Sequence, residues 1–107
     1  MAKKQLPKKI IEQVREFKKI LQADKLPVKD IYVFGSYAKG TARKDSDIDV
    51  AVISPKFKDS WSALSYLYAK LPYGVGWAIE PVGFNPKEFA DKYSTLIYEI
   101  KTHGVKV

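Results

Sequence analysis

The chain has 107 residues, no cysteine, a single histidine and a formal net charge of +7. Its length predicts one domain, residues 1–107, large enough to bury a core without disulfides. The lack of cysteine excludes thiolate metal sites and cysteine nucleophiles, and the lone His103 cannot build a histidine-rich zinc site. No apolar run approaches the ~20 residues needed to span a bilayer, so we expect a cytoplasmic protein without a membrane partner.

The positive charge favours polyanionic partners such as nucleotides, nucleic acid or an acidic protein. Most of the excess is scattered lysine, and a solvated lysine surface explains it equally well. Charge therefore permits nucleic acid as a partner without favouring it, and it leaves self-association open.

The first half of the chain predicts a helix, a strand and a short helical turn. Apolar residues recur at helical spacing after Pro7, which predicts an amphipathic helix ending near Gln22. The β-branched and aromatic segment Ile31–Phe34 predicts a strand. We expect Ser36–Lys39 to form one helical turn, with Gly40 as its left-handed terminator.

A second strand is predicted at Ser46–Ile53, after a polar linker. Only about a dozen residues separate the two strands, which is marginal for a parallel crossover and favours an antiparallel pair. An antiparallel return places the end of the first strand beside the start of the second. It therefore brings the turn at Gly35 and Ser36 next to Asp47.

The second half predicts a helix, a strand and a short helical turn before a final helix. We expect Ser60 to cap a helix that ends before Gly74, followed by a third strand at residues 77–84 that runs parallel to the second. The apolar positions of that helix, interpreted as core and flank, are Trp61, Leu64, Leu67, Tyr68 and Leu71. Asn85 is expected to cap the turn, and Ser94 or Thr95 to begin the final helix.

The order of elements is then α-β-α-β-α-β-α, and residues 105–107 offer a further short strand. This order predicts an α/β (α+β) fold with a small mixed sheet of three or four strands flanked by helices.

Three acidic residues carry the predicted chemistry. Asp47 and Asp49 share a face of their strand with Cα atoms roughly 6.5–7 Å apart, so both can reach one hard divalent cation or a pair of cations. Glu80 falls among apolar neighbours in a strand predicted to be buried, where a charge is costly unless a lysine or a cation neutralises it. Pro81 lacks an amide donor, which favours an edge strand.

These residues predict a two-metal Mg²⁺ site at Asp47, Asp49 and Glu80, because divalent cations relieve the repulsion between clustered carboxylates. Glu80 is expected to ligate the metal or to accept a proton from the nucleophile. Gly35 would let the backbone approach phosphates, and Ser36 would offer them a hydroxyl and an amide.

Cationic and small residues surround the turn. Lys39, Arg43 and Lys44 lie near enough in sequence to neutralise a departing pyrophosphate, although a solvated role fits each of them equally well. The predicted nucleotide- and phosphate-binding set is Gly35, Ser36, Lys39, Gly40, Arg43 and Ser46.

The sequence G-S-Y-A-K-G followed by S-D-I-D-V-A-V resembles the signature of the DNA polymerase β-type nucleotidyltransferase superfamily. Within it, the chain resembles the minimal nucleotidyltransferase (MNT) proteins, which are small single domains that often act as antitoxins paired with a helical HEPN toxin. A lone D-x-D would be a weak signal. Its combination with Gly-Ser and the spaced glycine is specific, and the order of elements fits the family throughout.

The resemblance implies a Mg²⁺-dependent nucleotidyltransferase that moves a nucleoside monophosphate onto a hydroxyl, with ATP as the expected donor of AMP and another nucleoside triphosphate as the alternative. The acceptor it suggests is a tyrosine of a HEPN toxin, with small molecules and RNA ends as alternatives. It makes Gly35 and Ser36 the phosphate-binding pair and Asp47 and Asp49 the metal ligands. Glu80 occupies the place of the third carboxylate, which is usually aspartate.

A rival interpretation is a binding module. If Glu80 does not reach the metals, the chain is a catalytically weak or inactive antitoxin that neutralises its partner by direct contact.

Overall fold

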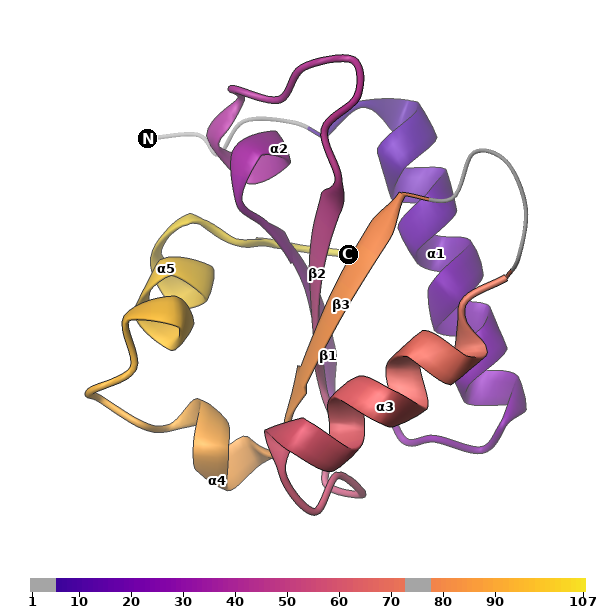
Figure 1. Ribbon diagram of the computed structural model, residues 1–107, viewed down its shortest axis with the longest axis vertical. Helices are drawn as coiled ribbons and strands as arrows, with labels where there is room; N and C mark the ends of the chain where they lie inside the picture. Colours follow the sequence, from indigo (N-terminus) through magenta and orange to yellow (C-terminus); the bar gives the residue numbers. More distant parts are fainter. Residues whose placement is uncertain (1–5, 73–77) are drawn as a thin grey trace.

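The computed structural model describes residues 6–72 and 78–107, which form a mixed four-stranded sheet flanked by helices (Figure 1). The helices are α1 (Lys8–Ala23), α2 (Ser36–Lys39), α3 (Ser60–Lys70), α4 (Pro86–Phe89) and α5 (Thr95–His103). The strands are β1 (Asp30–Phe34), β2 (Ile48–Ile53), β3 (Ile79–Phe84) and β4 (Val105–Lys106). This architecture confirms the predicted fold class.

The strands lie in the order β3-β2-β1-β4. β1 pairs antiparallel with both β2 and β4, whereas β2 and β3 are parallel and joined through α3. The antiparallel return and the parallel crossover were both predicted. β3 is an edge strand, as Pro81 indicated, since proline has no N–H with which to bind a further strand.

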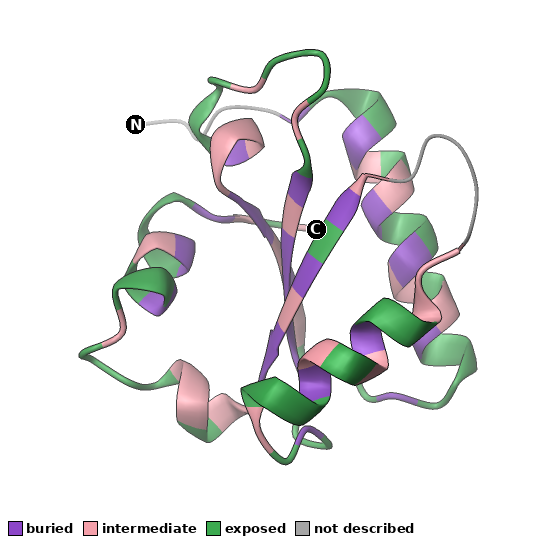
Figure 2. Cartoon of the chain, viewed as in Figure 1, coloured by how far each residue is buried: buried purple, intermediate pink, exposed green. Residues whose placement is uncertain are grey.

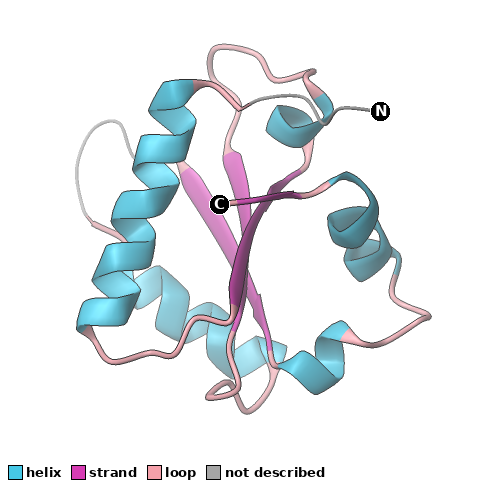
Figure 3. Ribbon diagram, turned by 180° about the vertical axis from the view of Figure 1, so that it is seen from behind, coloured by secondary structure: helices cyan, strands magenta, loops and turns pink. Residues whose placement is uncertain are grey.

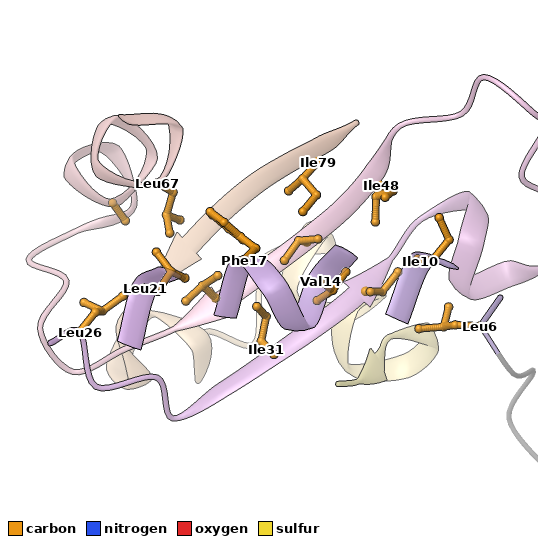
Figure 4. Packing of buried hydrophobic residues seen from close by; sticks show 14 of the residues in the cluster. Leu6, Ile10, Val14, Phe17, Leu21, Leu26, Ile31, Ile48, Leu67 and Ile79 are labelled. Atoms are coloured by element: carbon orange, nitrogen blue, oxygen red, sulfur yellow. The ribbon is translucent and has the colours of Figure 1, made fainter. Parts of the chain in front are cut away.

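Helices α1 and α3 pack on one face of the sheet, where the larger hydrophobic core lies (Figure 4). The buried residues of α1 recur every three or four positions and so form one stripe: Ile10, Val14, Phe17 and Leu21. Phe17 and Leu21 are fully buried, and each such side chain contributes about 1.5–3 kcal/mol through removal from water.

Helix α5 lies on the opposite side of the sheet from α1 (Figure 3). A smaller hydrophobic core lies beneath it. Ile97 and Ile100 of α5 are buried there against Phe34, Ile53 and Phe84. Figure 2 shows buried residues concentrated along the strands, with exposed residues on the outer sides of the helices. This second core fixes α5 beside the end of β1.

Helix α3 begins one residue earlier than the predicted cap implies. Its N-cap is Asp59, whose side chain accepts a hydrogen bond from the Ser62 N–H at 2.7 Å, so the prediction of Ser60 was wrong. An aspartate at this position satisfies an N–H that the helix leaves unpaired. Gly74 and residue 77 of the predicted third strand lie outside the described residues. Among the described helices, none has the length and apolar character to cross a bilayer.

The face that α3 turns to the sheet agrees with the prediction at Leu67, which is fully buried, and differs from it at Trp61 and Tyr68. Trp61 and Tyr68 are 79% and 48% exposed, and the residues that pack inward are Ala63 and Leu67. A Cβ at Gly83 of β3 would lie only 2.7 Å from the Ala63 Cβ, so two small residues set this close approach. The large aromatic side chains of α3 therefore lie to the side of its contact with β3.

Candidate active site

A sharp turn connects β1 to α2. Gly35 has φ 73° and ψ −146°, close to a backbone conformation that glycine almost alone adopts. Gly40 ends α2 in the left-handed conformation with φ 76°, and the Thr41 N–H donates to the Ser36 carbonyl at 2.9 Å. The predicted helical turn and its glycine terminator are both confirmed.

This turn lies directly against the Asp49 side chain. β1 and β2 pair with Phe34 opposite Asp49, so the next residue, Gly35, approaches the same carboxylate. A Cβ built on Gly35 would fall 2.1 Å from Asp49 Oδ2, so any larger residue would force the carboxylate to move. Glycine at position 35 therefore allows the turn and an aspartate to occupy adjoining space.

The loop before β2 is closed by Ser46. The Arg43 N–H donates to Ser46 Oγ at 2.7 Å, and the Ser46 N–H donates to the Arg43 carbonyl at 3.0 Å. The strand ladder starts only at Ile48, whose N–H donates to the Ala78 carbonyl at 2.7 Å. β2 thus begins two residues later than predicted, and Asp47 lies exposed at the junction of loop and strand.

Glu80 lies beside the two aspartates on the neighbouring strand. It pairs with Asp49 in the parallel ladder, and strands in such a ladder are about 4.8 Å apart. The side chain is exposed, which corrects the prediction of a buried position. β3 is at the sheet edge, so its residue 80 has a strand on one side only. Among the described residues, no lysine forms an ion pair with Glu80.

Neighbouring negative charges raise the pKa values of Glu80 and Asp49. The Asp47 charge, followed by burial and a hydrogen bond to Asp47, raises the pKa of Glu80 above its usual value, and Asp49 adds to the shift. Burial is the largest cause that raises the pKa of Asp49, followed by the charges of Asp47 and Glu99. A raised pKa means that the ionised cluster is disfavoured, and a cation would relieve it.

Sequence reasoning missed Glu99 of α5. Its carboxylate forms an ion pair with Lys39 on α2 and contributes to the negative potential at Asp49. Nothing in the local sequence pointed to Glu99, because it reaches the site only through the packing of α5 beside β1.

The donor chemistry suits Mg²⁺ in one particular mode. Among the described residues, no three acidic or histidine side chains converge into a ready metal-binding group. Mg²⁺ rarely uses such a cage and is commonly held by one or two carboxylates together with the substrate's phosphates. Asp47 and Asp49 fit that mode, and the metal assignment, with Glu80 in it, stays a prediction.

Comparison with known proteins now identifies the family. The profile of the nucleotidyltransferase domain matches residues 14–107. The chain belongs to the nucleotidyltransferase domain family. It is 42% identical over 94 residues to a Methanocaldococcus jannaschii protein named as a protein adenylyltransferase. The aligned region covers 83% of this chain and 93% of that protein.

Solved structures resemble this nucleotidyltransferase along most of its length. A chain from a toxin–antitoxin complex with AMP-PNP has a TM-score of 0.56 and 26% identity, covering 86% of this chain and 69% of that one. A variant of the MntA–HpeT toxin–antitoxin pair has a TM-score of 0.58 and 26% identity, and the match covers 88% of this chain and 70% of that one. A Sulfolobus solfataricus protein described as a nucleotidyltransferase has a TM-score of 0.57 and 20% identity, and the match covers 94% of this chain and 86% of that one. At this identity the likeness shows the fold alone.

These findings confirm the resemblance drawn from the motif and the expectation of an enzyme of the nucleotidyltransferase class. The roles of the individual residues stay predictions. The structure brings Gly35, Asp49, Asp47 and Glu80 together, and it places Lys39 beside Glu99. Arg43 and Ser46 contact each other in the loop, where Arg43 is exposed.

Proposed function

We propose that this nucleotidyltransferase transfers AMP from ATP to a hydroxyl with the help of Mg²⁺, and that the acceptor is a tyrosine of a HEPN-type toxin partner. The observation that carries the proposal is the Gly35 turn pressed against Asp49, with Asp47 and Glu80 alongside. The name of the Methanocaldococcus jannaschii relative favours AMP and a protein acceptor. The toxin–antitoxin neighbours, one of them with AMP-PNP, favour ATP and a toxin partner.

Asp47 and Asp49 would hold the metal, with Glu80 as a further ligand or as the proton acceptor. When bound, Mg²⁺ would neutralise phosphate charge and lower the pKa of the acceptor hydroxyl. Gly35 would let the chain lie close to the phosphates, and Ser36 would donate to them from its hydroxyl and amide.

In the transfer step, the acceptor oxygen bonds to the α-phosphorus as the bond from that phosphorus to the bridging oxygen breaks. Pyrophosphate leaves, and Lys39 and Arg43 lie close enough in the chain to neutralise it. The proton of the acceptor hydroxyl passes to Glu80, whose raised pKa makes it a better base than an ordinary carboxylate. Lys39 would exchange part of its contact with Glu99 for the phosphates.

The test is transfer of label from α-³²P-ATP in the presence of Mg²⁺ and the cognate partner. We expect the wild type to label the partner and the variant with both Asp47→Asn and Asp49→Asn to lose the activity. Asp91→Asn, an exposed aspartate in the connection between α4 and α5, is the matched control and should transfer normally. No labelling by the wild type, or unchanged labelling by the double variant, would sink the proposal.

A second candidate is an antitoxin that neutralises its partner by contact alone. The exposure of Glu80 favours it, as does the lack of a ready three-ligand metal group among the described residues. A toxin-neutralisation assay separates the two candidates. Neutralisation by contact survives the double aspartate substitution, whereas neutralisation by AMP transfer is lost with it.

A further inference from the structure

A cavity of about 330 Å³ opens between the start of α1, α2 and the loop that precedes β2. Its volume falls within the range of about 300–1,000 Å³ typical of small-molecule sites. The residues that matter for its chemistry are Ile10, Gln13, Tyr37, Lys44, Ser46 and Ile48. Of the predicted nucleotide-binding residues, Ser46 is the one among this cavity's described lining residues.

The cavity adjoins the carboxylates but lies on the other face of the sheet. Ile48 lines it, and because successive side chains of a strand alternate, Asp49, the next residue of β2, points the opposite way. Ser46, which also lines it, directly precedes Asp47, and Tyr37 directly follows Ser36. A ligand with its phosphates at Ser36 and Asp49 could therefore reach the cavity over the end of β2.

The lining suits a flat ring with polar edges. Ile10 and Ile48, which Figure 4 shows at one end of the large core, supply an apolar wall. Tyr37 adds an aromatic ring, on which any base can stack. Gln13 supplies a half-buried carboxamide whose Oε1 already accepts from the Ala78 N–H at 3.4 Å, so the group is directed at the lining.

Charge and chemistry narrow the ligand further. Carboxamides pair with adenine through its amino group and ring nitrogen, so Gln13 favours adenine over other bases. Lys9 and Lys44 bring two positive charges to the lining and Asp45 brings one negative charge, so the balance suits an anionic ligand. Two other cavities, one lined by Leu64 and Val82 and one by Leu26 and Phe57, contain neither a carboxamide nor a residue of the Gly35 turn.

We infer that this cavity binds the adenine and ribose of ATP, and that Gln13 selects adenine. The inference rests on the proposed function, because it assumes that a nucleoside triphosphate places its phosphates at the turn. It adds a specificity-determining residue on α1, an element that the nucleotide-binding motif does not include.

The experiment measures the binding of ATP, GTP and inorganic tripolyphosphate by calorimetry with Mg²⁺ present. We expect Gln13→Ala to weaken ATP binding about tenfold, the effect of losing one good pair of base contacts. GTP and tripolyphosphate should bind as they do to the wild type. The matched control is Gln22→Ala, the same substitution at an exposed site nine positions further along α1, about 13 Å away.

A second pair of variants tests the stacking ring. Tyr37→Phe keeps the ring and should leave ATP affinity unchanged, whereas Tyr37→Leu should lower it at least fivefold without changing the affinity for tripolyphosphate. The ratio of ATP to tripolyphosphate affinity is informative even if Tyr37→Leu lowers stability, since both ligands report on the same folded molecules.

The outcomes separate this inference from the proposed function. If the wild type binds ATP but Gln13→Ala leaves the ratio of ATP to GTP affinity unchanged, the inference is overturned and AMP transfer stands. Equal loss of ATP and tripolyphosphate binding in Gln13→Ala overturns it too, because the effect would then concern phosphate. If the wild type binds none of the three ligands, both the inference and the proposed function fail.

Discussion

Replacing Gly35 by alanine is the sharpest perturbation that the structure offers. The added Cβ would fall 2.1 Å from Asp49 Oδ2 and 3.0 Å from Asp49 Cγ. Comfortable contacts between such atoms are about 3.5 Å, so the carboxylate must move by roughly 1 Å or more. The φ of 73° adds a strain that is independent of any neighbour, since it belongs to the backbone itself.

The two costs can be given separate magnitudes. Holding alanine in this sparsely populated backbone region costs about 1–3 kcal/mol. Forcing an extra methyl group into occupied space costs about 1–3 kcal/mol more, with the low end expected because the half-buried Asp49 can swing away. Activity should fall about 100-fold even in folded protein, because a shift of 1 Å in a catalytic group has effects of that size.

A double-mutant cycle measured by urea unfolding tests this reasoning. In an Asp49→Ala background, the two closest atoms to the new Cβ are gone and the third, Asp49 Cβ, lies at an ordinary 3.4 Å. The Gly35→Ala substitution should then cost about 1 kcal/mol less than it does in the wild type, leaving the backbone strain. Costs that add within about 0.5 kcal/mol would refute the claim that the turn and the carboxylate share their space.

Three other predictions concern stability. Because the fold raises the pKa of Asp49, its contribution to stability is fully present below its usual pKa and is lost as the pH rises through the raised value. Asp49→Asn should therefore raise the melting temperature of the metal-free protein at pH 7, by the equivalent of about 1 kcal/mol, and leave it unchanged at pH 3. An equal rise in melting temperature at both pH values would contradict this reasoning. The Tyr66 hydroxyl donates to Asp24 Oδ2 at 2.6 Å, and burial followed by this bond raises the pKa of Tyr66 to about 12. The contribution of the Tyr66 hydroxyl to stability is present below about pH 10 and lost as the pH rises through 12. At pH 8 the urea midpoint of Tyr66→Phe should therefore be lower than that of the wild type. Above about pH 10 it should change less with pH than the wild-type midpoint does. Gly83→Ala should cost about 1–3 kcal/mol by overpacking, and adding Ala63→Gly should recover part of it in the same unfolding assay; no recovery would show that another contact dominates.

The turn and the two aspartates could be predicted because their signals are local. Glycine at Gly35 and Gly40 is needed for positive φ values that are set within a few residues, and these residues adopt them. The antiparallel return followed from the short length of the linker to β2. These features depend on neighbours in sequence, so a single sequence was sufficient to place them.

Features that depend on packing between distant segments were not predictable in the same way. Ion pairing of Lys39 with Glu99 joins residues sixty positions apart, and it exists only because α5 lies beside β1. The orientation of α3 was predicted from its large side chains, whereas the small Ala63 opposite a glycine decides it and leaves Trp61 exposed. Glu80 is exposed although Ile79 and Pro81 beside it are buried, because successive side chains of a strand point to opposite faces of the sheet.

The backbone angles of Gly35 have a consequence for handedness. With φ 73° and ψ −146°, the residue is close to the mirror image of the polyproline II conformation, at about −75° and +145°. The turn therefore has the local geometry of a D-amino acid, and of the encoded residues only the achiral glycine adopts it readily. A D-alanine at this position would be relaxed in its backbone. The methyl group of D-alanine would take the other substituent position on Cα, which differs from the one where the Cβ of an L-residue would meet Asp49.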